Sequence, residues 1–242
     1  QRSGSTWLID SLASHPQINA YTELFLQKGH GIPPWSRNKN VVYWNTFSNN
    51  HDSFRYQFLG LIKYLNDVFS RTESPNDAIG FKLMYDQALR HPKVLFYAII
   101  KRIKIVHLYR ENSVAAVISN ILRRERKTAH ITTETDLPKV NLSIDIDNTI
   151  KEIKWFDTKV KRIRWLTKLL PLPIYSISYE KLSTSPEIYL EIFQFLDVPP
   201  SEIKTRLKKL RGRAINEEII NFDELQAQLI GTKYEEMLNN LD

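Results

Sequence analysis

The chain has 242 residues, of which 42% are hydrophobic and 11% aromatic, and this composition excludes a disordered or low-complexity protein. Its 34 basic and 27 acidic residues give a net charge of +7, which favours an anionic partner: a nucleotide, a nucleic acid, a phosphorylated or sulfated small molecule, or a membrane surface. There is no cysteine, which excludes disulfides, zinc–thiolate sites and cysteine nucleophiles and leads us to expect a cytoplasmic protein. No apolar run approaches the ~20 residues of a membrane-spanning helix.

Helices and strands are predicted to alternate along the chain. Apolar residues at helical spacing predict helices over 5–14, 53–69, 92–101, 111–126, 148–170 and 186–196, with two more at the C-terminus. Short β-prone runs predict strands over 18–21, 78–84, 104–109 and 173–178. Residues 28–50 and 128–143 are predicted to be polar loops. This alternation indicates one α/β domain over 1–242, with a central parallel sheet between two helical layers.

The start of the chain combines small residues with the beginning of a helix. The residues concerned are Arg2, Ser3, Gly4, Ser5, Thr6 and Trp7. Backbone N–H groups at a helix N-terminus, with the hydroxyls beside them, can bind an anion. A Walker A loop would have lysine where Ser5 stands, and an ordinary helix cap by Ser3 or Ser5 is the alternative. Because loops of this kind follow a strand, we expect a strand before Gln1 in a longer protein.

A second candidate anion site follows the predicted strand 104–109. Arg110 lies at the C-terminal end of that strand, where ligands bind in open α/β sheets. Asn112 and Ser119 share one face of the next helix, about two turns apart. An arginine, a hydroxyl and a helix N-terminus together can hold an anion. The alternative is a surface arginine beside a serine that bonds its own backbone.

Taken together, these segments resemble the sulfotransferases that use 3′-phosphoadenosine-5′-phosphosulfate (PAPS), and the bacterial carbohydrate and glycolipid enzymes in particular. Residues 2–8 are similar to their 5′-phosphosulfate loop and 109–119 to their 3′-phosphate motif. Residues 79–83 and 178–199 are also similar, in the same order along the chain. The chain departs from the family in two places: glutamine stands before Arg2 where proline is frequent, and Ser119 follows the motif arginine by nine residues instead of eight.

The resemblance implies a P-loop-like three-layer fold and metal-free transfer of a sulfuryl group from PAPS to a hydroxyl of a carbohydrate or lipid-linked acceptor. It implies that Glu23 is the general base and that Arg2 and Lys82 neutralise the sulfuryl group. The donor-binding residues that it implies are Arg2, Ser3, Gly4, Ser5, Thr6, Trp7, Arg110, Ser119, Tyr179, Arg211, Gly212 and Arg213, with Trp7 and Tyr179 packing the adenine. From the residues alone, the alternatives are that Glu23 is a solvated turn residue, that Lys82 is an edge-exposed lysine and that 208–213 is a solvated charge cluster.

Several alternatives stay open from the sequence. The alternative function is that of a P-loop small-molecule kinase. A third hypothesis, a nucleic-acid-binding module, is supported by the net charge alone, and we do not expect a nucleic-acid partner. The basic helix 148–170 is either an ordinary amphipathic helix or a surface that rests on an acidic membrane. A homodimer is left open. His107 is predicted to be a bonded core residue, and His30, His51 and His130 are the reserve candidates for the base.

Overall fold

In this computed structural model the described residues are 4–26, 36, 41–48, 54–71, 74, 77–126, 141–205 and 218–241. The helices among them are α1 (Ser5–Leu12), α2 (Trp44–Ser48), α3 (Phe54–Phe69), α4 (Tyr85–Arg90), α5 (Pro92–Lys101), α6 (Ser113–Arg126), α7 (Ile146–Lys168), α8 (Tyr179–Thr184), α9 (Ile188–Leu196), α11 (Phe222–Leu229) and α12 (Glu235–Asn239). The strands are β1 (Ile18–Glu23), β2 (Ala78–Lys82), β3 (Ile105–Tyr109) and β4 (Ile174–Ser178).

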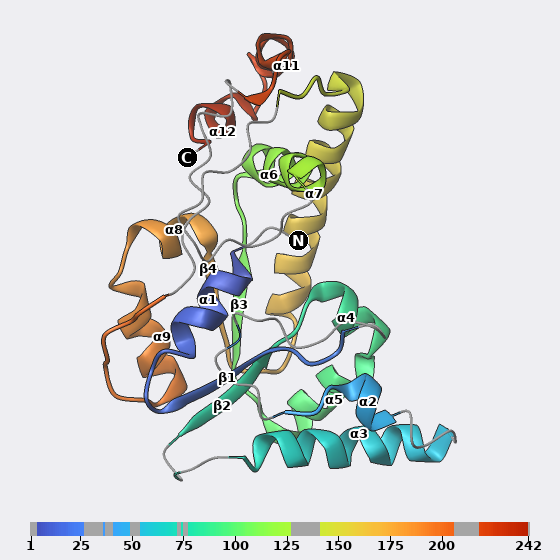
Figure 1. Cartoon of the computed structure of the whole chain (residues 1–242), viewed down its shortest axis with the longest axis vertical. Helices are drawn as coiled ribbons and strands as arrows, with labels where there is room; N and C mark the ends of the chain where they lie inside the picture. The colour runs from blue at the N-terminus through green and yellow to red at the C-terminus, as the bar shows by residue number, and fades with distance from the viewer. Residues whose placement is uncertain are drawn as a thin grey trace.

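The described strands form two parallel pairs (Figure 1). β1 pairs with β2, starting at Ile18 opposite Ala78, and β3 pairs with β4, starting at Ile105 opposite Ile174. Parallel neighbours require a crossover connection; α2 and α3 lie between β1 and β2 in the chain, and α6 and α7 lie between β3 and β4. The mixed α/β class with parallel strands is therefore confirmed.

One cluster of buried apolar side chains joins both strand pairs. It contains Leu8 of α1, Ala20 of β1, Leu108 of β3, Ile177 of β4 and Phe193 of α9. Burial of such side chains contributes about 1.5–3 kcal/mol each for the larger ones. Because α1 packs in this cluster with strands of both pairs, its first residues lie near the ends of strands from both: Thr6 contacts Lys82 of β2, and Gly4 contacts Tyr179, which follows β4.

Two further clusters cover the rest of the described chain. The end of β1 packs with α2, α3 and α5, in a cluster that includes Phe25, Trp44, Leu65 and Tyr97. The helices α6, α7, α11 and α12 pack around Ile118, Ile153, Ile219, Leu225 and Leu229. Among the residues that the structure describes, no helix is both long enough and apolar enough to cross a membrane.

The long helices and the four strands lie within two residues or so of their predicted ranges, but three short helices were not predicted. The expected loop over 28–50 is wrong in part, because it contains the helix α2. Two helices of six residues, α4 and α8, were also not expected. A helix of five or six residues covers less than two turns, so it carries no recognisable repeat of apolar residues.

A buried carboxylate fastens the C-terminal helices to α7. The Oδ2 atom of Asp157 accepts hydrogen bonds from Lys233 (2.6 Å), Lys161 (3.1 Å) and the hydroxyl of Tyr234 (3.4 Å). Burial by itself raises the pKa of Asp157, but the bonds from Lys233 and Lys161 outweigh it and leave the pKa below its ordinary value. The charged form of this side chain therefore stabilises the packing of α7 against the segment before α12.

We expect the substitution Asp157→Asn to lower the free energy of unfolding at neutral pH by about 1–2 kcal/mol. This loss is smaller than that for breaking a fully buried ion pair, because the side chains of both lysines are exposed. A depressed folded-state pKa contributes stability above the unfolded pKa, and this contribution is lost as pH falls below about 4. The difference between Asp157→Asn and the wild type should therefore shrink in acid. Denaturant unfolding at neutral and acidic pH measures it, with the exposed Asp147→Asn as the control; a pH-independent difference would contradict this account.

Candidate functional site

The C-terminal ends of β1 and β2 bring together a carboxylate and an ammonium group. The Nζ atom of Lys82 lies 2.7 Å from Oε1 of Glu23. The register of the pair shifts here: Tyr21 is opposite Phe81, but Glu23 rather than Thr22 is opposite Lys82. Because side chains alternate between the faces of a strand, this shift turns Glu23 to the same side as Lys82. The sequence alternation alone would have placed them on opposite sides.

The same ammonium group reaches the first turn of α1. Lys82 Nζ donates a hydrogen bond to Oγ1 of Thr6 over 3.2 Å, across 76 residues of sequence. The Lys82 side chain is only 10% exposed, so the alternative of an edge-exposed lysine is wrong. A buried ammonium requires a partner of opposite charge or an acceptor, and Glu23 and Thr6 provide one of each. Three predicted site residues therefore meet at one atom.

A residue that the sequence did not single out completes the contact. Nε2 of Gln87 donates to Oε2 of Glu23 over 2.7 Å, while its Oε1 accepts from the backbone N–H of Met84. Gln87 is 2% exposed and lies in α4, directly after β2. Both oxygens of the Glu23 carboxylate are thus held by side chains from the β2 side. The sequence offered one signal for Gln87, a polar residue soon after a strand end, but the helix that carries it was not predicted.

The first backbone N–H groups of α1 lie beside this cluster, because Thr6 in the first turn contacts Lys82. Gly4 is the N-cap of the helix in the left-handed conformation, with φ of 73°, and provides no side-chain cap. The first N–H groups of a helix have no partner within it and can bind an anion. The Oγ atom of Ser5 contacts the Met84 sulfur at 3.9 Å. Arg2 and Ser3, predicted to continue this loop, lie outside the described residues.

Tyr179 and Arg110 connect this loop to the second predicted anion site. A Cβ atom added to Gly4 would lie 2.2 Å from Cδ2 of Tyr179, so the ring lies directly on the glycine. The guanidinium carbon of Arg110 is 4.9 Å from the centre of the same ring, a cation–π distance. Gly4, Tyr179 and Arg110 therefore form a continuous row between α1 and the start of α6.

We expect Gly4→Ala to lower the free energy of unfolding by about 1–3 kcal/mol, because a side chain there adds left-handed strain and displaces the Tyr179 ring. Gly231→Ala is a matched control, since Gly231 also has φ of 73° but an added Cβ would have no atom within 4 Å. Thermal unfolding of both variants measures the difference. Equal losses of stability would mean that the contact with Tyr179 has no energetic importance.

A carboxylate of the chain itself occupies the backbone donors beside Arg110. Glu180 accepts from the N–H groups of Glu111 (3.1 Å) and Asn112 (3.0 Å), and its Oε1 lies 3.8 Å from Nε of Arg110. The Arg110 side chain is 12% exposed, and burial lowers its pKa while Tyr179 and Glu180 act in the opposite direction. Arg110 and the two N–H groups therefore do bind an anion, but the anion is the Glu180 carboxylate, which was not predicted from the sequence to lie here.

The remaining predicted residues fall into two groups. Trp7 is half-buried and packs edge-on against Tyr189, with ring centres 6.3 Å apart, and Ser119 is half-buried in α6. Their roles toward a nucleotide stay predictions. Arg211, Gly212 and Arg213, as well as His30, His51 and His130, lie outside the described residues.

His107 is a bonded core residue, as predicted. Its Nε2 lies 2.8 Å from the hydroxyl of Tyr85 and its Nδ1 lies 3.2 Å from Oγ of Ser176. Burial, and to a lesser extent the charge of Arg164, lowers its pKa to about 4, so the ring is neutral at physiological pH. Both ring nitrogens have partners, which makes His107 a poor candidate for the base.

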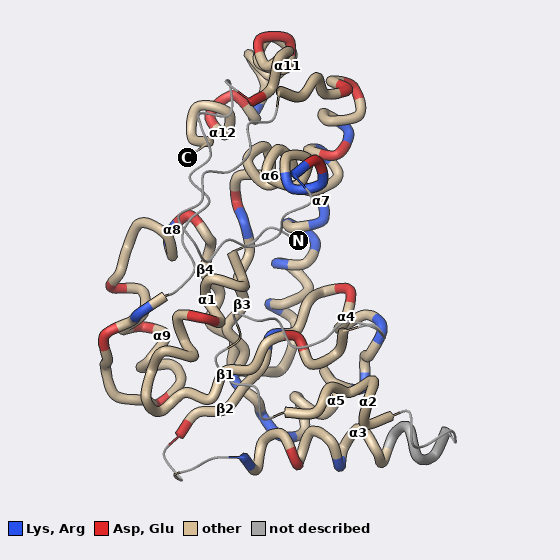
Figure 2. The backbone as a smooth tube through the Cα atoms, viewed as in Figure 1, with Lys and Arg blue, Asp and Glu red and all other residues tan. Residues whose placement is uncertain are grey.

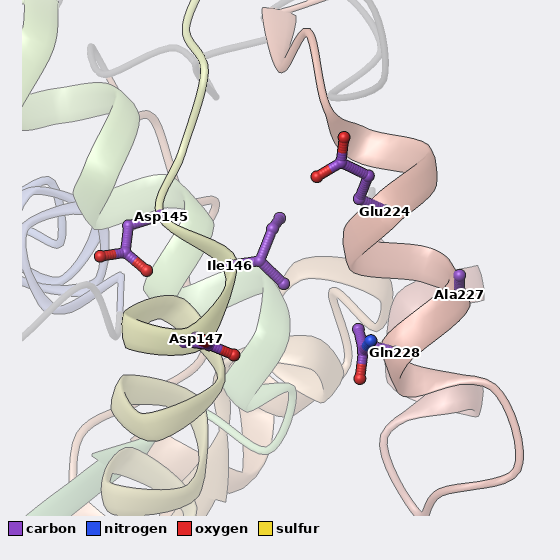
Figure 3. Close-up of a pocket in the computed structure, with 6 residues that line it drawn as sticks. All are labelled: Asp145, Ile146, Asp147, Glu224, Ala227 and Gln228. Carbon is purple, nitrogen blue, oxygen red and sulfur yellow. The ribbon is translucent and has the colours of Figure 1, made fainter.

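A separate open pocket of about 390 Å³ lies between the start of α7 and α11 (Figure 3). Three acidic side chains, Asp145, Asp147 and Glu224, line it with Ile146 and two residues of α11. One of them has a structural role, since Asp145 caps α7 by accepting from the N–H of Asn148. In the described part of the chain no group of three or more histidines and acidic residues is arranged to hold a metal ion. The predicted residues that the structure describes lie elsewhere: at the C-terminal ends of the strands β1 to β4, at the start of α1 and on α6.

Comparison of the chain with protein-family models, with characterised proteins and with solved structures gives no match in any of the three. The family resemblance therefore rests on the sequence motifs alone. What the geometry adds is that residues chosen from separate motifs lie in contact: Thr6, Glu23 and Lys82 in one cluster, and Gly4, Arg110 and Tyr179 in the adjoining row.

Proposed function

We propose that the chain transfers a sulfuryl group from PAPS to a hydroxyl of a carbohydrate or lipid-linked carbohydrate, on a three-layer P-loop-like fold. The observation that carries this proposal is the position of Lys82, whose ammonium joins Thr6 at the start of α1 to Glu23 at the tip of β1. A proton acceptor, a cation and a helix N-terminus are then within a few ångströms of one another. This is the set of groups that sulfuryl transfer requires.

Each of these groups has a distinct task in the proposal. When bound, PAPS supplies an activated sulfuryl group on a phosphate leaving group. Glu23 accepts the proton of the acceptor hydroxyl; a carboxylate has about four lone-pair directions, and the bonds from Lys82 and Gln87 use two of them. Lys82, Thr6 and the first N–H groups of α1 stabilise the negative charge that grows on the bridging oxygen. A sulfuryl group carries less negative charge than a phosphoryl group, so cationic side chains can neutralise it.

The row of Gly4, Tyr179 and Arg110 provides the binding surface for the nucleotide. Gly4 lets the backbone approach closely, and the Tyr179 ring offers a face for the adenine, worth about 1–3 kcal/mol by stacking. Arg110 and the N–H groups of Glu111 and Asn112 would receive the 3′-phosphate in place of the Glu180 carboxylate. The proposed donor site further includes Ser119, Trp7, Arg211, Gly212 and Arg213.

The test is an assay of radiolabelled sulfate transfer from PAPS to a panel of sugars, glycolipids and small alcohols, run with EDTA and with Mg²⁺. We expect transfer to at least one hydroxyl acceptor at the same rate in both. Phosphate transfer from ATP that requires Mg²⁺, without transfer from PAPS, would replace this proposal with the kinase alternative.

A further inference from the structure

The outward face of α7 combines cations with exposed aromatic and aliphatic side chains. Between residues 151 and 169, ten of its exposed residues form what we call the basic–aromatic face: Lys151, Lys154, Trp155, Lys159, Lys161, Arg162, Trp165, Leu166, Lys168 and Leu169. The four apolar members are 46–62% exposed. No acidic side chain within 151–169 is exposed, since Glu152 is half-buried and Asp157 is buried. In Figure 2 blue segments accordingly recur along α7.

These residues lie on one side of the helix because of their spacing. Lys151, Trp155, Lys159, Arg162 and Leu166 follow one another at steps of three and four, which keeps them on a single strip. The opposite side of α7 is occupied: Ile153 is fully buried against α6 and the C-terminal helices. Leu166 is on the exposed side, with 46% of its surface exposed.

The chemistry of the basic–aromatic face fits one class of partner. Lysines are depleted from the cores of protein–protein interfaces, so a second protein is disfavoured. A nucleic acid is also disfavoured: the tryptophans could stack on its bases, but the exposed leucines have no aromatic ring with which to do so. Tryptophans at the headgroup level, leucines below them and lysines extended to lipid phosphates are the features of a helix lying in a membrane interface. The Nζ atom of Lys159 lies 4.5 Å from the centre of the Trp155 ring, so a cation for lipid phosphate and a ring for the headgroup region lie side by side.

We propose that the basic–aromatic face of α7 is a peripheral docking surface for an anionic lipid bilayer, with Trp155 and Trp165 entering the headgroup region. The helix α7 also contacts the candidate site. The Arg164 side chain stacks on the ring of Tyr109, which ends β3 and directly precedes Arg110. The inference does not depend on sulfuryl transfer, since it concerns adsorption of the folded chain to lipid.

The test is sedimentation of the full chain with vesicles of phosphatidylcholine alone and of phosphatidylcholine mixed with an equal amount of phosphatidylglycerol. We expect binding to the mixed vesicles only, weakened by high salt. The variant Lys151→Gln/Lys154→Gln/Lys168→Gln should bind about 100-fold more weakly. A control with the same loss of charge, Lys63→Gln/Lys101→Gln/Lys181→Gln, changes exposed lysines of α3, α5 and α8 and should stay within about threefold of the wild type.

The tryptophans are tested separately at constant charge. Trp155→Ala/Trp165→Ala should weaken binding about tenfold or more, and quenching by brominated lipid should be lost in Trp155→Phe/Trp165→Phe while the vesicles are still bound. Circular dichroism establishes that each variant is folded. Equal binding to both vesicle types, or equal weakening by the two lysine triples, would overturn the proposal. So would preferential binding of a single-stranded oligonucleotide, or a dimer in sedimentation equilibrium that Trp155→Ala/Trp165→Ala dissociates.

Discussion

The substitution Glu23→Gln is expected to reduce turnover by about 10²–10⁴-fold, the range for a positioned general base. The amide keeps the size of the side chain and can still accept from Lys82 through its oxygen, but it cannot take a proton from the acceptor hydroxyl. The affinity for the donor nucleotide should therefore hardly change. Single-turnover rates with saturating PAPS, alongside titration with adenosine 3′,5′-bisphosphate, measure the two quantities.

The matched control for Glu23→Gln is Glu152→Gln on α7. Glu152 also pairs with a cation, Arg124 at 3.6 Å, but lies outside the site. Its variant should retain normal turnover. If Glu23→Gln itself has near-normal turnover, Glu23 is not the base, and the histidines at 30, 51 and 130 become the candidates.

The substitution Lys82→Met is expected to reduce turnover by about 10²–10³-fold, as expected for the loss of one electrostatic contact to the transition state. Methionine is also long and unbranched, so it fills similar space without the charge. The ammonium group joins Thr6 and Glu23, so its removal also leaves the Glu23 carboxylate without its ion pair. The effects of Lys82→Met and Glu23→Gln should consequently be non-additive, and a double-mutant cycle on turnover measures the coupling.

Lys104→Met is the control for this variant. Lys104 forms an ion pair with Asp197, away from the cluster, so its loss tests the general effect of removing a paired lysine. Normal turnover is expected. Strict additivity of Lys82→Met and Glu23→Gln would mean that the contact between the two side chains has no part in the reaction.

The sequence predicted the long elements and the types of residue at the site, but not how they meet. Apolar periodicity placed α3, α5 and α7 to within two residues at each end, because each shows more than two turns of a single pattern. It could not predict the register shift at Thr22 that brings Glu23 opposite Lys82, since pairing register depends on the partner strand. Periodicity also could not predict α4, because six residues are too few to show a repeat. The contact of Gln87 with Glu23 was therefore not predicted either, since α4 carries Gln87.

The second anion site illustrates the same limit. The motif predicted a cation and a helix start at Arg110, and both are present. The carboxylate of Glu180, which lies on the same N–H groups, comes from a segment about seventy residues later, so no local pattern could assign it.

The Glu180 carboxylate occupies the N–H groups that the 3′-phosphate would bind. The variant Glu180→Gln should therefore bind adenosine 3′,5′-bisphosphate more tightly than the wild type, because it no longer repels the 3′-phosphate. Weaker binding by this variant would mean that Glu180 orients Arg110 for the ligand instead.

The most direct test of the central claim, that this site takes a 3′-phosphorylated adenine nucleotide, is calorimetric titration with adenosine 3′,5′-bisphosphate in the presence of EDTA. We expect micromolar binding of this nucleotide and much weaker binding of adenosine 5′-phosphate, because only the 3′-phosphate reaches Arg110. In Arg110→Ala the preference between the two nucleotides should largely disappear. Absence of binding in EDTA, or an undiminished preference in Arg110→Ala, would contradict the account.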